Sequence, residues 1–373
     1  MAPGENARNV KKIHLIAAAR PNFMKVAPLY HALTREAWCQ PAIVHTGQHY
    51  DPNMSDAFFR DLRMPKPDFH LEVGSGTHAE QTGRVMIEYE KVAMAQKPDW
   101  IVVVGDVNST AACAMVGAKL WIPVVHLEAG LRSRDRHMPE EINRLVTDAL
   151  SDLLWTPSRD ADANLLAEGV PAERIECIGN IMIDSYEMLR SAIEADGTRA
   201  RLGLSSGDYG VVTLHRPSNV DGRDALGTLV ERLLEVARDL PLVFAVHPRT
   251  RKKLTEFGLD AALTANSRVQ LIDPLGYIEF MNLVTGARAV ITDSGGVQEE
   301  TTYLGIPCLT LRENTERPVT VTEGSNRLVK PETLVAEVRS ALARKSRLGR
   351  RPDLWDGQAA RRAAESLRRR SVA

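Results

Sequence analysis

Short apolar runs alternate with segments of helical periodicity along most of the chain. Continuous apolar runs of this length, separated by helices, are typical of a parallel β-sheet covered by helices on both faces. In the first half the predicted strands lie at 13–17, 42–45, 100–105 and 123–127, with helices beginning near 24 and covering 55–62 and 109–119. In the second half the predicted strands lie at 210–214, 242–246, 269–272, 289–292 and 307–311.

This repetition predicts an α/β fold with two doubly wound, Rossmann-like domains. A chain of 373 residues also exceeds what one hydrophobic core usually supports. The pattern breaks at Glu194–Gly197. We therefore expect an N-terminal domain at 10–185 and a C-terminal domain at 200–355. A final helix at 356–373 is expected to pack back on the N-terminal domain.

The final helix is rich in arginine, yet alanines and Leu367 recur in it at helical spacing. That pattern is typical of an amphipathic helix with a solvated basic face, and it disfavours a nucleic-acid-binding tail. The net charge of -1 likewise gives no general attraction to nucleic acid or to an anionic membrane. We expect neither as a partner.

The remaining composition narrows the class of protein. No apolar run approaches the ~20 residues that a membrane helix needs. The four cysteines form no C-x-x-C pair, which favours buried thiols in a reducing compartment, the cytoplasm. The metal motif H-E-x-x-H is absent, as are G-x-S-x-G, Walker A and G-x-G-x-x-G. The sequence thus disfavours a triad hydrolase, an ATPase and a dinucleotide-dependent dehydrogenase, and it predicts no metal and no cofactor.

One segment predicts a phosphate site. A β-branched run ending at Thr292 is followed by Asp293, then Ser294-Gly295-Gly296, after which a helix begins. Free backbone N–H groups and the positive helix end suit a phosphate there. Glu300, about one turn into the helix, could reach a sugar hydroxyl. The segment is typical of a clamp for a nucleoside diphosphate.

Ligands of parallel α/β sheets bind beyond the carboxyl ends of the strands. Two domains whose strand ends face each other would gather such residues in one interdomain cleft. The residues that this rule selects are Arg20, Gln48, His49, Asp106, Glu128, His215, His247, Asp293 and Ser294.

Asp106 and Glu128 follow successive predicted strands, so two acids there could differ in pKa and serve as acid and base. Alternatively, Asp106 could cap the helix that begins near Ser109, and Glu128 could be neutralised by Arg132 or Arg134. The sequence leaves these alternatives open.

Three further groups have both a functional and a structural interpretation. Pro139–Arg144 has the composition of a helix start, and at most one of its two glutamates, Glu140 and Glu141, is expected to line a cleft. His215 could be a satisfied structural histidine. Arg20 and Lys25 bracket the start of the first helix, where they could support a diphosphate or pair with acids.

Taken in order, these stretches resemble the bacterial UDP-N-acetylglucosamine 2-epimerase family, which has the two-domain glycosyltransferase B fold. The resemblance runs from Arg20 to about Val329. Its carriers are the segments 20–25, 46–49, 105–106, 126–132, 139–144, 179–180, 215–216, 293–300 and 315–318.

The resemblance implies inversion at C2 of a UDP-linked amino sugar, UDP-GlcNAc to UDP-ManNAc, by elimination of UDP to a glycal and its re-addition. It implies that Asp106 and Glu140 handle protons at C2, that Glu128 supports them, and that His215 assists the leaving phosphate. It also implies a homodimer. The positions matching UDP-sugar contacts are Arg20, Lys25, Arg144, His247, Ser294, Gly295, Gly296, Glu300 and Arg317.

The chain departs from well-known members at two places. Pro217 follows His215-Arg216 where many have a second arginine, and Tyr50–Met54 follows the second motif. Activation by a second UDP-sugar is therefore left open, and the substrate could be a modified sugar such as a 2,3-diacetamido uronic acid.

Three other activities are alternatives. A hydrolysing epimerase would release free ManNAc and UDP, but Arg20-Pro21 and Lys25 favour the non-hydrolysing branch. A glycosyltransferase would need one base rather than three acids around C2. A catalytically dead UDP-sugar sensor is disfavoured because all three acids are present.

Overall fold

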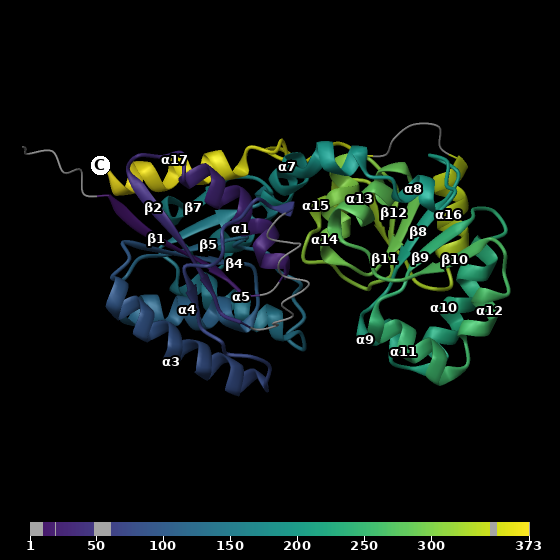
Figure 1. Ribbon diagram of the computed structural model, residues 1–373, viewed down its shortest axis with the longest axis horizontal. Coiled ribbons are helices and arrows are strands. Elements are labelled where there is room, and N and C mark those ends of the chain that lie inside the picture. The colour runs from purple at the N-terminus through teal and green to yellow at the C-terminus, as the bar shows by residue number, and fades with distance from the viewer. Residues whose placement is uncertain (1–9, 19, 48–60, 344–348, 373) are drawn as a thin grey trace, which may run out of the picture. The chain divides into compact units, whose positions relative to one another are not determined.

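The computed structural model describes residues 10–18, 20–47, 61–343 and 349–372. The chain divides into two compact units, Met1–Met188 with Asp353–Ala373, and Leu189–Pro352. Each contains one β-sheet flanked by helices (Figure 1). The chain passes from the first unit to the second within α7 (Ile181–Ala195).

The first unit has a seven-stranded parallel sheet in the order β3-β2-β1-β4-β5-β6-β7. The order turns back between β1 and β4, as in doubly wound folds. The strands are β1 (Lys11–Ala17), β2 (Cys39–His45), β3 (Phe69–His70), β4 (Trp100–Val104), β5 (Val124–Leu127), β6 (Leu153–Thr156) and β7 (Ile175–Cys177). The helices are α1 (Arg20–Leu33), α3 (His78–Gln96), α4 (Asn108–Lys119), α5 (Pro139–Leu150), α6 (Arg159–Ala167), a 3-10 turn at Ala172–Arg174, α7, and α17 (Ala359–Ser371).

The last helix, α17, belongs to the first unit, where Figure 1 shows it in yellow beside α1. Its alanine face is buried, while most of its arginines are exposed. Asp184 of α7 accepts the N–H groups of Ala359 and Ala360 at 3.1 and 2.8 Å, which caps the start of α17. Trp155 of β6 donates to Ser366 at 3.0 Å. Burial and capping together hold the helix on this unit.

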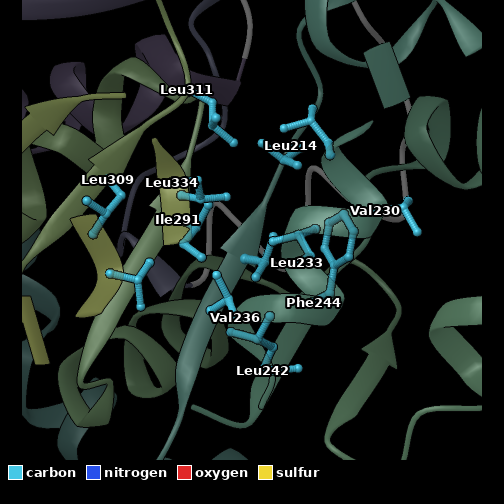
Figure 2. Packing of buried hydrophobic residues seen from close by; sticks show 14 of the residues in the cluster. Leu214, Val230, Leu233, Val236, Leu242, Phe244, Ile291, Leu309, Leu311 and Leu334 are labelled. Atoms are coloured by element: carbon cyan, nitrogen blue, oxygen red, sulfur yellow. The ribbon is translucent and has the colours of Figure 1, made fainter. Parts of the chain in front are cut away.

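The second unit has a six-stranded parallel sheet in the order β10-β9-β8-β11-β12-β13. Its strands are β8 (Gly210–Thr213), β9 (Leu242–Ala245), β10 (Val269–Ile272), β11 (Ala289–Thr292), β12 (Cys308–Thr310) and β13 (Asn326–Leu328). Its helices are α8 (Thr198–Arg201), α9 (Pro217–Val220), α10 (Arg223–Val236), α11 (Pro248–Phe257), α12 (Asp260–Thr264), α13 (Tyr277–Gly286), α14 (Gly295–Leu304), α15 (Val319–Thr322) and α16 (Leu334–Ala343). Figure 2 shows Phe244 of β9 packed with leucines and valines of α10 in its core.

The predicted α/β class with two Rossmann-like parallel sheets is confirmed. The sequence pattern missed β3, β6, β7 and β13. Of these, β3, β7 and β13 have only two or three residues each and so carry little periodic signal. The predicted helix at 55–62 lies almost wholly outside the described residues. Within the described part of the chain, no helix has the length and apolar character needed to span a membrane.

Candidate functional site

Asp106 lies just beyond β4, where its carboxylate binds a buried arginine. Its Oδ2 is 2.5 Å from Nη1 of Arg144 on α5, and its side chain is 31% exposed. The N-cap position of α4 is occupied by Val107, so the cap interpretation of Asp106 is not what the fold uses. Arg144 thus holds one carboxylate oxygen of Asp106, while part of the side chain remains exposed to solvent.

Arg144 is itself held by Glu141, one turn earlier on α5. The two side chains are 2.7 Å apart and almost fully buried. Glu141 also accepts the N–H groups of Ser133 and Arg134, both at 2.9 Å. Burial alone would raise the pKa of Glu141, but the hydrogen bonds from Arg144 and Ser133 outweigh it and lower that pKa. Glu141 is thus a structural anion.

Glu140, the neighbouring glutamate, is exposed at the first turn of α5. Successive helical residues point about 100° apart, so one glutamate can be buried while the next faces solvent. Only Glu140 of the pair is therefore open to a ligand.

Glu128 follows β5 and is buried in an ion pair with Lys25 of α1. Its φ of 74° lies in the left-handed region, which is uncommon for non-glycine residues. Neither predicted arginine neutralises it: Arg132 pairs with Asp148 at 2.7 Å, and Arg134 is exposed. A Cβ at Gly105 would lie 3.4 Å from both Glu128 Oε2 and Lys25 Nζ, so this pair adjoins the peptide that leads into Asp106.

Three other predicted residues of the first unit lie wholly or partly outside the described part of the structure. Arg20 is the first residue of α1, and its side chain falls outside the described part of the structure. Gln48 and His49 also fall outside the described residues.

In the second unit, Asp293 and His215 meet at the ends of β11 and β8. Asp293 is fully buried and lies 2.9 Å from Nδ1 of His215. It also accepts the backbone N–H groups of His215 and Arg216 and the side-chain amide of Asn219. Burial would raise the pKa of Asp293, but the hydrogen bond from His215 outweighs it, and the pKa is lowered. The carboxylate therefore keeps a proton on Nδ1, leaving Nε2 for a ligand.

A pocket of about 300 Å³ opens beyond the strand ends of this unit. It has a polar side formed by two histidines and a serine and an apolar side formed by proline, leucine and phenylalanine. Its lining residues are Thr213, His215, Ala245, His247, Pro274, Leu275, Phe280, Ser294 and Val297. The strand-end rule found His215, His247 and Ser294 but missed Pro274, Leu275 and Phe280, because it selects polar groups only.

His247 lines the pocket and also caps the start of a helix. Its Nδ1 accepts the N–H of Arg249 at 3.2 Å and so caps α11. Its ring centroid lies 5.5 Å from that of His215. Burial, and then the neighbouring His215, lower the pKa of His247.

Ser294, Gly295 and Gly296 form the start of α14, as the sequence predicted, with no acid in its first turn. The two glycines differ in their surroundings. A Cβ on Gly295 would lie 2.8 Å from Nη1 of Arg317, whereas one on Gly296 would meet nothing within 4 Å. Gly295 thus faces the protein and Gly296 open space, where an anion can approach the helix N-terminus.

Arg317 is buried between two carboxylates of its own unit. It lies 2.8 Å from Glu299 and 2.5 Å from Glu316. Glu300, the predicted hydroxyl ligand, is also buried, and the hydroxyl of Tyr277 hydrogen-bonds to it. Burial raises the pKa of Glu300 to about 8, so it is mostly protonated at neutral pH.

Known proteins resemble this chain over most of its length. The family model described as UDP-N-acetylglucosamine 2-epimerase matches residues 31–368. The UDP-N-acetylglucosamine 2-epimerase of Methanocaldococcus jannaschii is 45% identical, covering 90% of this chain and 93% of the relative. The UDP-2,3-diacetamido-2,3-dideoxy-D-glucuronate 2-epimerase of Pseudomonas aeruginosa is 43% identical, covering 85% and 88%.

A solved structure agrees with these relatives. The crystal structure of the M. jannaschii UDP-GlcNAc 2-epimerase in complex with UDP-GlcNAc and UDP matches with a TM-score of 0.87 and 43% identity, covering 95% of this chain and 99% of that one. Sequence and structure thus agree over nearly the full length of both proteins, and the chain belongs to the UDP-N-acetylglucosamine 2-epimerase family.

Proposed function

We propose that this enzyme inverts C2 of a UDP-linked N-acetylated amino sugar and converts UDP-GlcNAc to UDP-ManNAc without net hydrolysis. The observation that carries the proposal is the pair of acids at neighbouring strand ends, Asp106 and Glu128, each held by its own cation. That arrangement occurs in a chain 45% identical to a UDP-GlcNAc 2-epimerase.

The reaction needs such acids because the hydrogen on C2 is not next to a carbonyl group. In the proposed path the C2–H and C1–O bonds break, UDP leaves, and a glycal with a C1–C2 double bond remains. A proton then adds to C2 from the opposite face while UDP returns to C1, so nothing is oxidised or reduced. Positioned proton transfer contributes roughly 10²–10⁴-fold, so stabilisation of the departing diphosphate must supply much of the remainder.

Exposure supports a division of labour among the three carboxylates. Asp106 and Glu140 are open to solvent and are proposed to remove and return the proton at C2. Glu128 is enclosed with Lys25, so it is proposed to act through its neighbours instead of taking the proton itself. In this assignment Lys25 holds Glu128 in place, and Arg144 orients Asp106.

The second unit is proposed to hold UDP. The N-terminus of α14 at Gly296 suits the diphosphate, and Nε2 of His215 suits the leaving oxygen. The pocket, with Phe280 on its apolar side, is proposed to take the flat uracil ring.

Two more residues of the second unit, Glu300 and Arg317, are proposed to contact UDP. Glu300 would bind the ribose hydroxyls, and Arg317 would bind a phosphate. Because Arg317 is paired with Glu299 and Glu316, a phosphate must share or displace one carboxylate. The pairing keeps the guanidinium in place before UDP arrives.

A modified sugar is the second candidate substrate. The relative named for a 2,3-diacetamido uronic acid is 43% identical, close to the 45% of the UDP-GlcNAc epimerase. Overall identity therefore does not separate the two sugars. Both would follow the same path at C2.

The test is incubation with UDP-GlcNAc in deuterated water, followed by proton NMR. We expect UDP-ManNAc with deuterium at C2. Free ManNAc with UDP would indicate the hydrolysing branch, and exchange only with the diacetamido uronic acid would indicate the second substrate. Asp106→Asn should keep UDP affinity and lose exchange, and a wild-type exchange rate in that variant would refute the catalytic assignment.

We also propose that the enzyme works as a homodimer in the cytoplasm. The chain mass is 41.2 kDa, so sedimentation equilibrium should give about twice this value for a dimer. A single species at the mass of one chain would contradict the dimer.

A further inference from the structure

A buried cluster of charged and polar side chains adjoins the peptide that leads into Asp106. Its centre is His126 of β5, which is fully buried. Its Nδ1 lies 2.5 Å from Asp148 Oδ1, and its Nε2 lies 2.8 Å from the carbonyl oxygen of Gly105. The histidine therefore bridges α5 and the turn that follows β4.

Both partners of His126 are hydrogen-bond acceptors. A neutral imidazole has one N–H and one lone pair, so it can donate to only one of them. The other side of Asp148 is already satisfied, since its Oδ2 accepts from Arg132 at 2.7 Å and from the N–H of Gly130 at 3.1 Å. Such a carboxylate is ionised. The geometry thus requires a proton on each nitrogen of the histidine.

An ionised carboxylate faces the ring of His126. Asp148 on α5 contacts Nδ1, Arg132 of the loop after β5 binds Asp148, and Glu168 at the end of α6 binds Arg132 at 2.6 Å. Asp148 and Arg132 are almost fully buried, whereas the side chain of Glu168 is 35% exposed. An ionised carboxylate has no proton to give, so the ring nitrogen that faces Asp148 must be the donor.

The cluster acts on the peptide that carries Asp106. The N–H of Gly105 donates to the carbonyl of Leu127 at 3.0 Å, and the carbonyl of Gly105 accepts from His126. With a φ of +69°, Gly105 turns the chain into Asp106. Both the N–H and the carbonyl group of Gly105 are therefore hydrogen-bonded to residues of β5.

One face of α5 contacts the side chain of Asp106 directly and its backbone through His126. Arg144 and Asp148 lie four residues apart on α5, so they project from one face. Arg144 binds the carboxylate of Asp106, and Asp148 binds the histidine that holds its preceding carbonyl.

We propose that His126 is an imidazolium and a positioning residue for C2 proton transfer, holding the Gly105–Asp106 peptide against α5. Its kinetic part rests on the proposed function. Because it touches no reacting atom, its loss should displace Asp106 without removing a substrate contact. A displacement of about 1 Å can lower a rate by about 100-fold.

The protonation state is measured by ¹⁵N NMR of the wild-type protein labelled at its histidines, at about pH 8, where an ordinary histidine is mostly neutral. We expect one imidazole with both nitrogens in the protonated range. His14 of β1 is the internal reference, because burial lowers its pKa to about 4 and it should appear neutral. If none of the ten histidines is an imidazolium at that pH, the proposal is overturned.

The positioning role is measured with His126→Gln, and His14→Gln is the matched control. Both histidines are buried on strands of the same sheet, but within the described part of the chain the hydrogen bond of His14 is to Tyr89, at 3.2 Å. We expect kcat for C2 exchange to fall about 10- to 100-fold in His126→Gln, with KM changed less than about threefold. An equal effect in both variants, or a change confined to KM, would refute the role.

Two failures remain distinguishable. If His126→Gln does not fold, the wild-type NMR spectrum still decides the imidazolium. If the wild type exchanges no hydrogen with either UDP-sugar, the proposed function fails, while the spectrum still decides the charge of His126.

Discussion

Replacing Arg144 by methionine should destabilise the first unit strongly. The change leaves Glu141, which is 2% exposed, without its cation. Removing one partner of a buried ion pair costs about 3–5 kcal/mol. Glu141 keeps three donors, the N–H and hydroxyl of Ser133 and the N–H of Arg134. We therefore expect the lower end, about 3 kcal/mol.

Urea unfolding followed by tryptophan fluorescence measures this loss unit by unit. All five tryptophans belong to the first unit, so their fluorescence reports its unfolding and not that of the second. The midpoint should fall with the slope unchanged, which indicates a change in stability alone. The tryptophans are Trp38, Trp100, Trp121, Trp155 and Trp355.

Two control variants separate the lost charge from general disruption. Asp106→Asn removes the other anion on Arg144, but this side chain is 31% exposed and the arginine keeps Glu141, so the loss should stay below about 1 kcal/mol. Arg144→Met combined with Glu141→Met removes both buried charges and should be more stable than Arg144→Met alone. The reasoning is refuted if Arg144→Met loses less than about 1 kcal/mol, or if the double variant is no more stable than the single.

Four further predictions concern the second unit. Gly295→Ala should destabilise it by about 1–3 kcal/mol, because the Cβ would lie 2.8 Å from a buried guanidinium nitrogen. Gly296→Ala should leave stability unchanged and weaken UDP binding about tenfold, as measured by calorimetry. Unchanged affinity would show that the phosphate does not bind at this turn. Burial raises the pKa of Glu300 from 4.5 to about 8, so its stabilising contribution is complete below about pH 4.5 and is lost as the pH rises through 8. The melting temperature of the wild type minus that of Glu300→Gln should therefore fall between about pH 5 and 8, and a flat difference would contradict the burial. Asp293→Asn and His215→Gln should each lower the C2 exchange rate, and the double variant should lower it no further, because the two side chains act as one unit; independent, additive losses would argue against the pair.

The positions of several candidate residues could be predicted because parallel strands end at a common edge. Asp106, Glu128, His215 and His247 each follow a strand of mainly apolar residues, and local sequence is enough to recognise such strands. The start of α14 at Gly295 was equally local, since glycine and a change of periodicity mark it. Of the four strands that escaped this reasoning, β3, β7 and β13 have only two or three residues.

The tertiary structure decided which side chain neutralises which. From the sequence, Arg132 was the nearer partner for Glu128, yet the ion pair forms with Lys25, 103 residues away. Asp106 meets Arg144 across 38 residues in place of capping the adjacent helix. Strand and helix patterns depend on the few neighbouring residues that share a face, so the sequence determined the elements and their polar ends. Pairing depends on how helices from distant segments pack over the sheet, and only the folded chain brings those charges within hydrogen-bond distance.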